Sequence, residues 1–154
     1  MSRIAPAGRG VEIQLSSAEI AILSRLPSLL GSVGSDPTDP APARLHPAAY
    51  PDDEEGSAEL ARLTKDDLAE GRTADVDVFA RQLPDSGDGI TISSADAEAW
   101  MRVLGSARIV LASRRGLFDL DDLAELPNDD PDVALVNLLG AYQQTLAEVL
   151  MAGM

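Results

Sequence analysis

Two short segments of the chain alternate apolar and polar positions and then change to the spacing of a helix. The first reads VEIQLSSAE from residue 11, and the second reads GITISSAD from residue 89. A period of two is typical of a half-buried strand, and a serine three positions before an acidic residue is typical of a helix N-cap. Each segment therefore predicts a short strand that leads directly into a capped helix, with the cap at Ser16 or Ser17 in the first and at Ser93 or Ser94 in the second.

The rest of the N-terminal half has helical periodicity interrupted by one long polar stretch. Apolar residues spaced three and four apart predict a helix over 17–33, which Pro27 should kink or shorten. Residues 34–56 are rich in Pro, Gly and Asp, and they indicate a long surface loop. Two further helices are expected at 57–63 and 64–83, separated by a second capping pattern.

The C-terminal part predicts two more helices. The segment 97–112 is apolar on almost all sides, which is typical of a helix at the centre of a small core. Trp100 and Met101 are expected to belong to that core. The Asp-Pro pair at 130–131 is a cap followed by a favoured first helical residue, and it predicts a last helix over 131–151.

These elements together predict a mainly α fold, a single compact domain of about five helices. Because isolated strands must pair to satisfy their backbones, we expect one small two-stranded β-sheet in which 11–15 pairs with 89–93. Residues 1–10 are expected to be a flexible N-terminal arm, and 11–154 a single helical domain with its loop at about 34–56. The length of 154 residues suits one domain, and a core with only 3% aromatic residues must be built from aliphatic side chains, which suits packed helices.

The charge of the chain narrows its range of partners. The formal net charge is −14, so the surface should repel phosphate backbones and anionic lipid, and we expect neither non-specific DNA binding nor membrane binding. No apolar run approaches the ~18 residues of a membrane span, and no signal peptide is evident, so a cytoplasmic protein is expected. The chain has no cysteine, which excludes disulfides, thiolate metal sites and cysteine nucleophiles.

The sequence offers little support for catalysis. His46 is the only histidine, and without neighbours at ligand spacing it indicates an exposed loop residue. The acidic run at 119–132 does not fit a calcium-binding loop, because Ala124 stands where an EF-hand needs glycine. No glycine-rich phosphate-binding loop is present. We therefore predict no catalytic residue, no metal ligand and no cofactor, and we do not expect an enzyme.

Arginine is the one residue type that clusters in the predicted central helix. The candidate partner-binding residues are Arg102, Arg108, Arg114 and Arg115. One interpretation is internal: Glu98 and Arg102 are spaced to pair along the helix, and the last two arginines complement its C-terminus. The other is a basic spot that contacts an acidic partner or a phosphate. Both interpretations stay open at this point.

Four segments carry a family resemblance: RLHPAAYPDD at 44–53, ARLTKDDLAEGR at 61–72, ITISSADAEAWMRVLGSARIVLASRRGL at 90–117 and DPDVALVNLLGAYQQTLAEVL at 130–150. Their order resembles an actinobacterial domain-of-unknown-function family that includes the oxidative-stress transcriptional regulator AosR. The resemblance implies a cytoplasmic regulator of transcription in the redox response, which acts with a sigma factor or with a proteolysis adaptor of the Clp pathway. A thiol switch cannot operate here, because the chain has no cysteine.

The leading hypothesis is a non-enzymatic regulatory protein that acts mainly through protein–protein contacts. The alternatives are a small enzyme with a carboxylate site in the long loop and a purely structural dimer. The last helix has an apolar face wider than one neighbour requires, so we expect a homodimer with this helix at its interface. That face comprises Leu135, Leu138, Leu139, Tyr142, Leu146, Val149 and Leu150.

Overall fold

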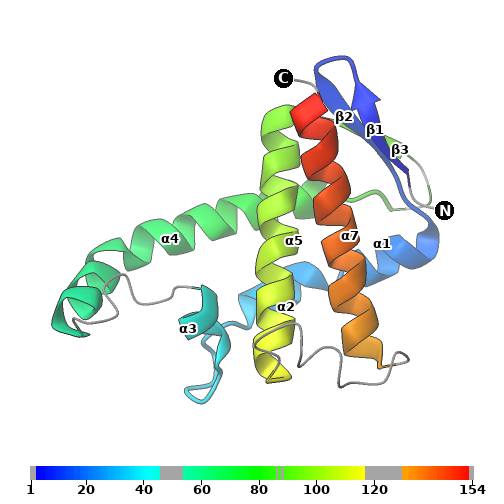
Figure 1. Cartoon of the computed structure of the whole chain (residues 1–154). Coiled ribbons are helices and arrows are strands. Elements are labelled where there is room, and N and C mark those ends of the chain that lie inside the picture. The colour runs from blue at the N-terminus through cyan, green and yellow to red at the C-terminus, as the bar shows by residue number, and fades with distance from the viewer. Residues whose placement is uncertain (1–2, 46–53, 86, 88, 117–129, 153–154) are drawn as a thin grey trace.

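The computed structural model describes residues 3–45, 54–85, 87, 89–116 and 130–152 (Figure 1). Within these ranges the chain forms a helical bundle with a small sheet at one end. The elements in chain order are β1 (Arg3–Ala7), β2 (Gly10–Gln14), α1 (Ser17–Leu23), α2 (Leu26–Gly31), α3 (Ala41–Leu45), α4 (Glu54–Gln82), β3 (Gly89–Ser93), α5 (Ser94–Arg114) and α7 (Pro131–Ala152). The predicted mainly α class is confirmed.

The sheet has three antiparallel strands in the order β1-β2-β3, so the predicted two-stranded sheet is wrong. The expected pairing is present, with Val11 opposite Ile92 and Ile13 opposite Ile90. The additional strand is β1, which comes from the segment expected to be a flexible arm and pairs with β2. A two-residue turn joins the two strands, and its Gly8 has a φ of +59°, which glycine adopts without strain.

Both predicted caps are formed at the ends of the strands. Ser16 accepts a hydrogen bond from the backbone N–H of Glu19 at 3.2 Å, and the Glu19 carboxylate accepts one from the backbone N–H of Ser16 at 3.0 Å. Ser93 caps α5 in the same way by accepting from the N–H of Asp96 at 3.1 Å. The Glu19 carboxylate also accepts a hydrogen bond from the Tyr142 hydroxyl, which ties the start of α1 to α7.

Two helix boundaries differ from the prediction. The expected helix over 17–33 is divided into α1 and α2, because Pro27 stands in the first turn of α2, where a proline is tolerated. The two helices expected at 57–63 and 64–83 are instead the continuous α4, whose 29 residues span roughly 43 Å. A capping pattern in the sequence does not end a helix when neither proline nor another breaker interrupts it. Figure 1 shows the N-terminal half of α4 extending away from the bundle.

The core lies around α5, as its apolar pattern predicts. Trp100 is buried and meets Phe79 of α4 edge-to-face, with ring centroids 4.6 Å apart. The Trp100 Nε1–H donates to Gln82 at 2.8 Å, so the polar end of the indole is satisfied. Met101 is only partly buried and packs at the edge of the core. The sheet covers one end of this core with the buried side chains of Val11, Ile13, Leu15 and Ile92.

The last helix begins where the sequence predicts it. The Asp130 carboxylate accepts from the backbone N–H of Asp132 at 2.9 Å, and Pro131 is the first helical residue. The apolar face of α7 is largely covered within the chain, since Leu139, Tyr142 and Leu146 are buried. The surplus apolar surface that led us to expect a homodimer is therefore smaller than the pattern indicated, and the homodimer stays a prediction.

The close approach of β2 and β3 generates a test of the sheet. A Cβ at Gly10 would lie 2.3 Å from the carbonyl oxygen of Ile92, so Gly10→Ala should separate the strands and lower the free energy of unfolding by about 1–3 kcal/mol. Gly71→Ala is the matched control, because a Cβ there meets nothing within 4 Å and should stabilise α4 by about 1 kcal/mol. Urea unfolding of the three proteins measures both effects. Equal stability of Gly10→Ala and the wild type would contradict the strand pairing.

Candidate partner-binding surface

The four candidate arginines do not form one basic spot. Arg102 contacts α4, Arg114 contacts the segment between α2 and α3, and Arg108 and Arg115 contact α7 at positions far apart along that helix. Arg102 meets Asp75 of α4 through two parallel hydrogen bonds, Nε to Oδ2 at 2.8 Å and Nη2 to Oδ1 at 3.0 Å. This bond raises the pKa of Arg102, and the charge of Glu98 adds a smaller effect in the same direction. The pair expected within the helix is thus replaced by a link between helices.

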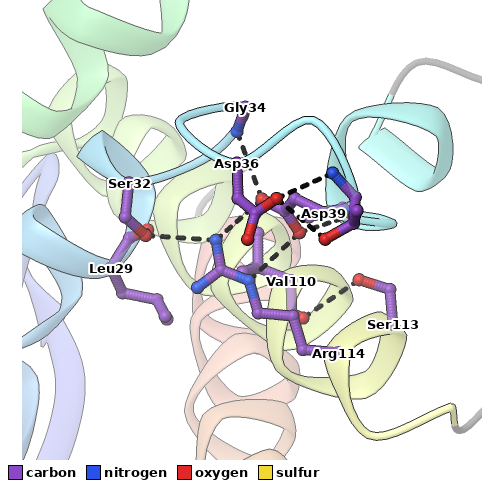
Figure 2. Close-up of polar contacts among 10 residues, drawn as sticks. Leu29, Ser32, Gly34, Asp36, Asp39, Val110, Ser113 and Arg114 are labelled. Atoms are coloured by element: carbon purple, nitrogen blue, oxygen red, sulfur yellow. Dashed lines mark hydrogen bonds and ion pairs between the residues drawn. The ribbon is translucent and has the colours of Figure 1, made fainter.

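Arg114 connects the end of α5 to the segment between α2 and α3 (Figure 2). Its Nη2 donates to Asp39 at 2.9 Å and to the Ser32 hydroxyl at 3.1 Å, and its Nε donates to Asp39 at 3.2 Å. The Asp39 carboxylate also accepts from the backbone N–H groups of Gly34 and Ala41. Hydrogen bonding to Arg114 first, and then to Ala41, lowers the pKa of Asp39 far below its ordinary value.

Arg115 joins α5 to the beginning of α7. Its Nη2 lies 2.5 Å from Asp130 Oδ2, and its Nε lies 3.4 Å from Asp132 Oδ2. Arg114 and Arg115 therefore hold the C-terminal end of α5 through ion pairs rather than by capping its carbonyl groups. Three of the four candidate arginines are engaged with carboxylates of their own chain.

Arg108 differs from the other three. Its Nη1 donates to the side-chain oxygen of Gln143 on α7 at 3.0 Å, and no ion pair to a described carboxylate accompanies this bond. The guanidinium lies close against Gly140, where a Cβ would stand 3.1 Å from the Arg108 Cζ. Gln143 in turn lies over Gly105 of α5 and donates to the Met101 carbonyl at 3.4 Å. Each helix thus supplies a glycine where the other places a polar side chain.

One strip of α5 is left open between its neighbours. In the view of Figure 1, no described element lies over the near side of α5, between α4 and α7. Ile109 of α5 has 41% of its surface exposed, although Ala107 and Val110 on the same helix are fully buried. We call Met101, Gly105 and Ile109 the open strip.

A hollow lies on each side of the open strip. The first, of about 600 Å³, lies between α5 and α7 and is lined by Met101, Arg108, Asn137, Gly140, Ala141, Gln143, Gln144 and Ala147. The second, of about 680 Å³, is more apolar and lies between α5 and α4, with Leu30, Asp75, Arg102 and Ile109 among its lining residues. Met101 and Gln143 border both hollows, so the two form one continuous surface across α5.

The sequence identified only part of this surface. Arg102 and Arg108 flank the open strip, whereas Arg114 and Arg115 lie at the far end of α5 and do not contribute. Gln143, Asn137 and Ile109 were not predicted as site residues. A signal was present, because glycines at 105 and 140 each weaken a helix interior by about 1 kcal/mol relative to alanine and therefore indicate a packing role.

Two described carboxylates of the long loop, Asp36 and Asp39, have lowered pKa values, which is the opposite of what a catalytic acid needs. Hydrogen bonds from Thr38 lower the pKa of Asp36, and the pKa of Asp39 is also lowered, whereas a general acid needs a raised value. In the described part of the chain, no group of three or more His, Asp or Glu side chains is placed to hold a metal ion. His46 and residues 119–129 of the acidic run lie outside the described residues.

The comparison with protein families is informative over nearly the whole chain. Residues 1–150 match the model of a domain of unknown function, DUF2017. The chain belongs to the DUF2017 family. No curated protein and no solved structure matches this DUF2017 chain. The family resemblance predicted from the sequence is thus confirmed as far as a domain of unknown function. Among the described helices of the DUF2017 fold, none is both long and apolar enough to cross a membrane.

The Asp39–Arg114 contact predicts a pH-dependent contribution to stability. Because the folded pKa of Asp39 lies below its ordinary value of 3.8, the contact should stabilise the fold above that pH and lose its effect as the pH falls through the lower folded value. Asp39→Asn should therefore lower the melting temperature at pH 7, and the difference from the wild type should shrink below about pH 4. Asp77→Asn, at an exposed carboxylate of α4, is the control and should change little at either pH. A difference that is constant with pH would contradict the assignment.

Proposed function

We propose that this DUF2017 protein is a non-enzymatic cytoplasmic regulator that acts through protein–protein contacts on the open strip of α5. The observation that carries the proposal is the exposure of Ile109 on the helix that otherwise forms the centre of the core. Ile109 lines the hollow between α5 and α4 together with Leu30, Met101 and Val103, and a contiguous apolar surface of this kind is typical of a protein-interaction site, whereas a single exposed apolar residue is not. The finer proposal is that the protein resembles AosR-type transcriptional regulators of the redox response, with a sigma factor or a Clp-pathway adaptor as its partner.

The distribution of charge supports a protein partner over a nucleic acid. The net charge of −14 opposes the approach of a phosphate backbone, and Arg102, Arg114 and Arg115 are already paired with carboxylates. A phosphate could bind these three arginines only by displacing the carboxylates that they already hold. The same charge speeds the encounter with a basic protein surface, since complementary potentials raise the rate of association. We therefore expect a partner whose surface is basic around its contact region.

The alternative of an enzyme with a carboxylate site in the loop gains no support from the described loop residues. Asp36 and Asp39 have lowered pKa values and engage local hydrogen bonds. Their arrangement fixes the backbone between α2 and α3 rather than presenting a proton donor to a cleft.

Affinity capture from the native lysate tests the proposal. Ile109→Asp should lose the partner protein that the wild type retains, because a charge on the open strip would be buried on binding. Met151→Asp is the matched control, since Met151 is a large apolar residue that is 71% exposed at the end of α7. Circular dichroism should show the same helix content for all three proteins.

The identity of the captured protein, read by mass spectrometry, tests the finer proposal. A sigma factor or a proteolysis adaptor is expected, and a wild-type chain that captures only further copies of itself would replace this proposal with the structural dimer. Capture of the same proteins by the wild type and by Ile109→Asp would contradict the role of the open strip.

A further inference from the structure

The helix α7 carries little charge for a chain that is so acidic. Only Asp132 and Glu148 are charged among its 22 residues, whereas charged residues recur along the whole of α4. An exposed helix face is normally charged or strongly polar, because water covers it. The outer face of α7 is therefore unusual for a face that stays in contact with water.

Six exposed residues of α7 form one stripe with a regular spacing. They lie alternately three and four positions apart, which is the spacing of the contact seam of a coiled coil. The stripe lies opposite Leu139 and Leu146, which face the core and are buried. Within the described part of the chain α7 packs mainly against α5 and β1, and neither element covers this face. The residues of this outer stripe are Ala134, Asn137, Ala141, Gln144, Glu148 and Met151.

The outer stripe is self-complementary when two copies of α7 lie antiparallel. A two-fold axis at the middle of the stripe places Ala134 opposite Met151 of the second copy, and Ala141 opposite Gln144 of the second copy. Each small side chain then meets a large one, and alanine lets the two helix axes approach closely. The two-fold axis repeats both contacts, so the whole stripe takes part.

The one acidic residue of the outer stripe meets an amide in this arrangement. Glu148 lies opposite Asn137 of the second copy, and an amide N–H is a good donor to a carboxylate. Asn137 makes no side-chain hydrogen bond to a described residue of its own chain, so its donors are available. No two carboxylates of the stripe face each other, which matters because two chains of net charge −14 repel each other over most of their surfaces.

We infer that α7 binds the α7 of a second copy of this chain through the outer stripe, antiparallel and about a two-fold axis. A partner with a basic surface would find little attraction here, because the stripe has a single charge, whereas a copy of the same stripe matches it in size and in hydrogen bonding. The contact differs from the homodimer expected from the sequence, whose leucine-rich face is largely covered within the chain. The inference goes beyond the proposed function, since Ile109 of the open strip lies at the other hollow, between α5 and α4.

The contact joins one helix to one helix, and so small an interface gives a weak dimer. We expect a dissociation constant of about 100 µM, since interfaces below the standard size are weak. Sedimentation equilibrium of the full chain should therefore show the mass rising from 16.2 kDa at about 10 µM toward twice that value at about 1 mM. Affinity capture from a lysate works far below these concentrations, so Met151 stays exposed there and Met151→Asp remains a valid control.

Opposite charges at Asn137 test its pairing with Glu148. Asn137→Asp should weaken the dimer about tenfold, because it places a carboxylate opposite each Glu148, and Asn137→Lys should tighten it by about the same factor. Ala80→Asp and Ala80→Lys are the matched controls, since they change the net charge equally at an exposed residue of α4. Both controls should leave the dissociation constant nearly unchanged.

Cross-linking tests the register of the two helices, because the chain has no cysteine of its own. A short bis-maleimide should join Ala134→Cys to Met151→Cys when the two variants are mixed at high concentration. Each variant alone should give no cross-linked dimer, because the two copies of residue 134 lie about 25 Å apart in this register.

Three results would overturn the inference. The first is a mass that stays at 16.2 kDa at about 1 mM. The second is a dimer that responds equally to Asn137→Asp and Asn137→Lys, and the third is cross-linking of Ala134→Cys to itself as readily as to Met151→Cys. None of these results bears on the open strip, whose test is the loss of the captured partner by Ile109→Asp.

Discussion

The packing of α5 against several neighbours at once is the constraint on which the rest of this fold depends. Its buried residues, among them Trp100, Val103, Leu104 and Val110, contact other elements around most of the helix. Each large apolar side chain buried in this way contributes about 1.5–3 kcal/mol. Ion pairs from Arg102, Arg114 and Arg115 then join α5 to α4, to the segment before α3 and to the beginning of α7. What this packing leaves uncovered is the open strip.

Two glycine contacts between α5 and α7 link the packing to the proposed site: Gln143 of α7 lies over Gly105, and Arg108 of α5 lies against Gly140. Gly140 leaves room for the Arg108 guanidinium to lie against α7. The contact between the two helices therefore also holds the positive charge of Arg108 at the edge of a hollow. A site on two packed helices is positioned more accurately than one on a loop. The position of the proposed partner surface is therefore set by the packing of α5 against α7.

Sequence patterns predicted the local parts of this fold well. Ser16 and Ser93 cap their helices because capping depends on residues three positions apart, and β2 pairs with β3 because two isolated apolar strands had to meet. The strand β1 was missed, since RIAPA lacks clear alternation and contains Pro6. A proline is tolerated there because β1 lies at the edge of the sheet. That edge position is a property of the assembled sheet rather than of the segment.

The candidate site was less predictable because its contacts join distant parts of the chain. Helical periodicity gives the direction in which Arg114 leaves α5, but its partner Asp39 is 75 positions away. Likewise, nothing local distinguishes Arg108, which lacks a described carboxylate partner, from Arg102, which has one 27 positions away. The residues that line the hollows become neighbours only when α4, α5 and α7 pack.

Because the chain has no cysteine, thiol labelling of single-cysteine variants directly measures how exposed the open strip is and whether a partner covers it. In the purified protein, Ile109→Cys should react rapidly, whereas Val110→Cys, at a fully buried position, should react slowly. In the native lysate, the account predicts that Ile109→Cys becomes protected by its partner while Met151→Cys keeps its rate. Labelling of Ile109→Cys at the same rate with and without the lysate would contradict the open strip as the surface through which this protein acts.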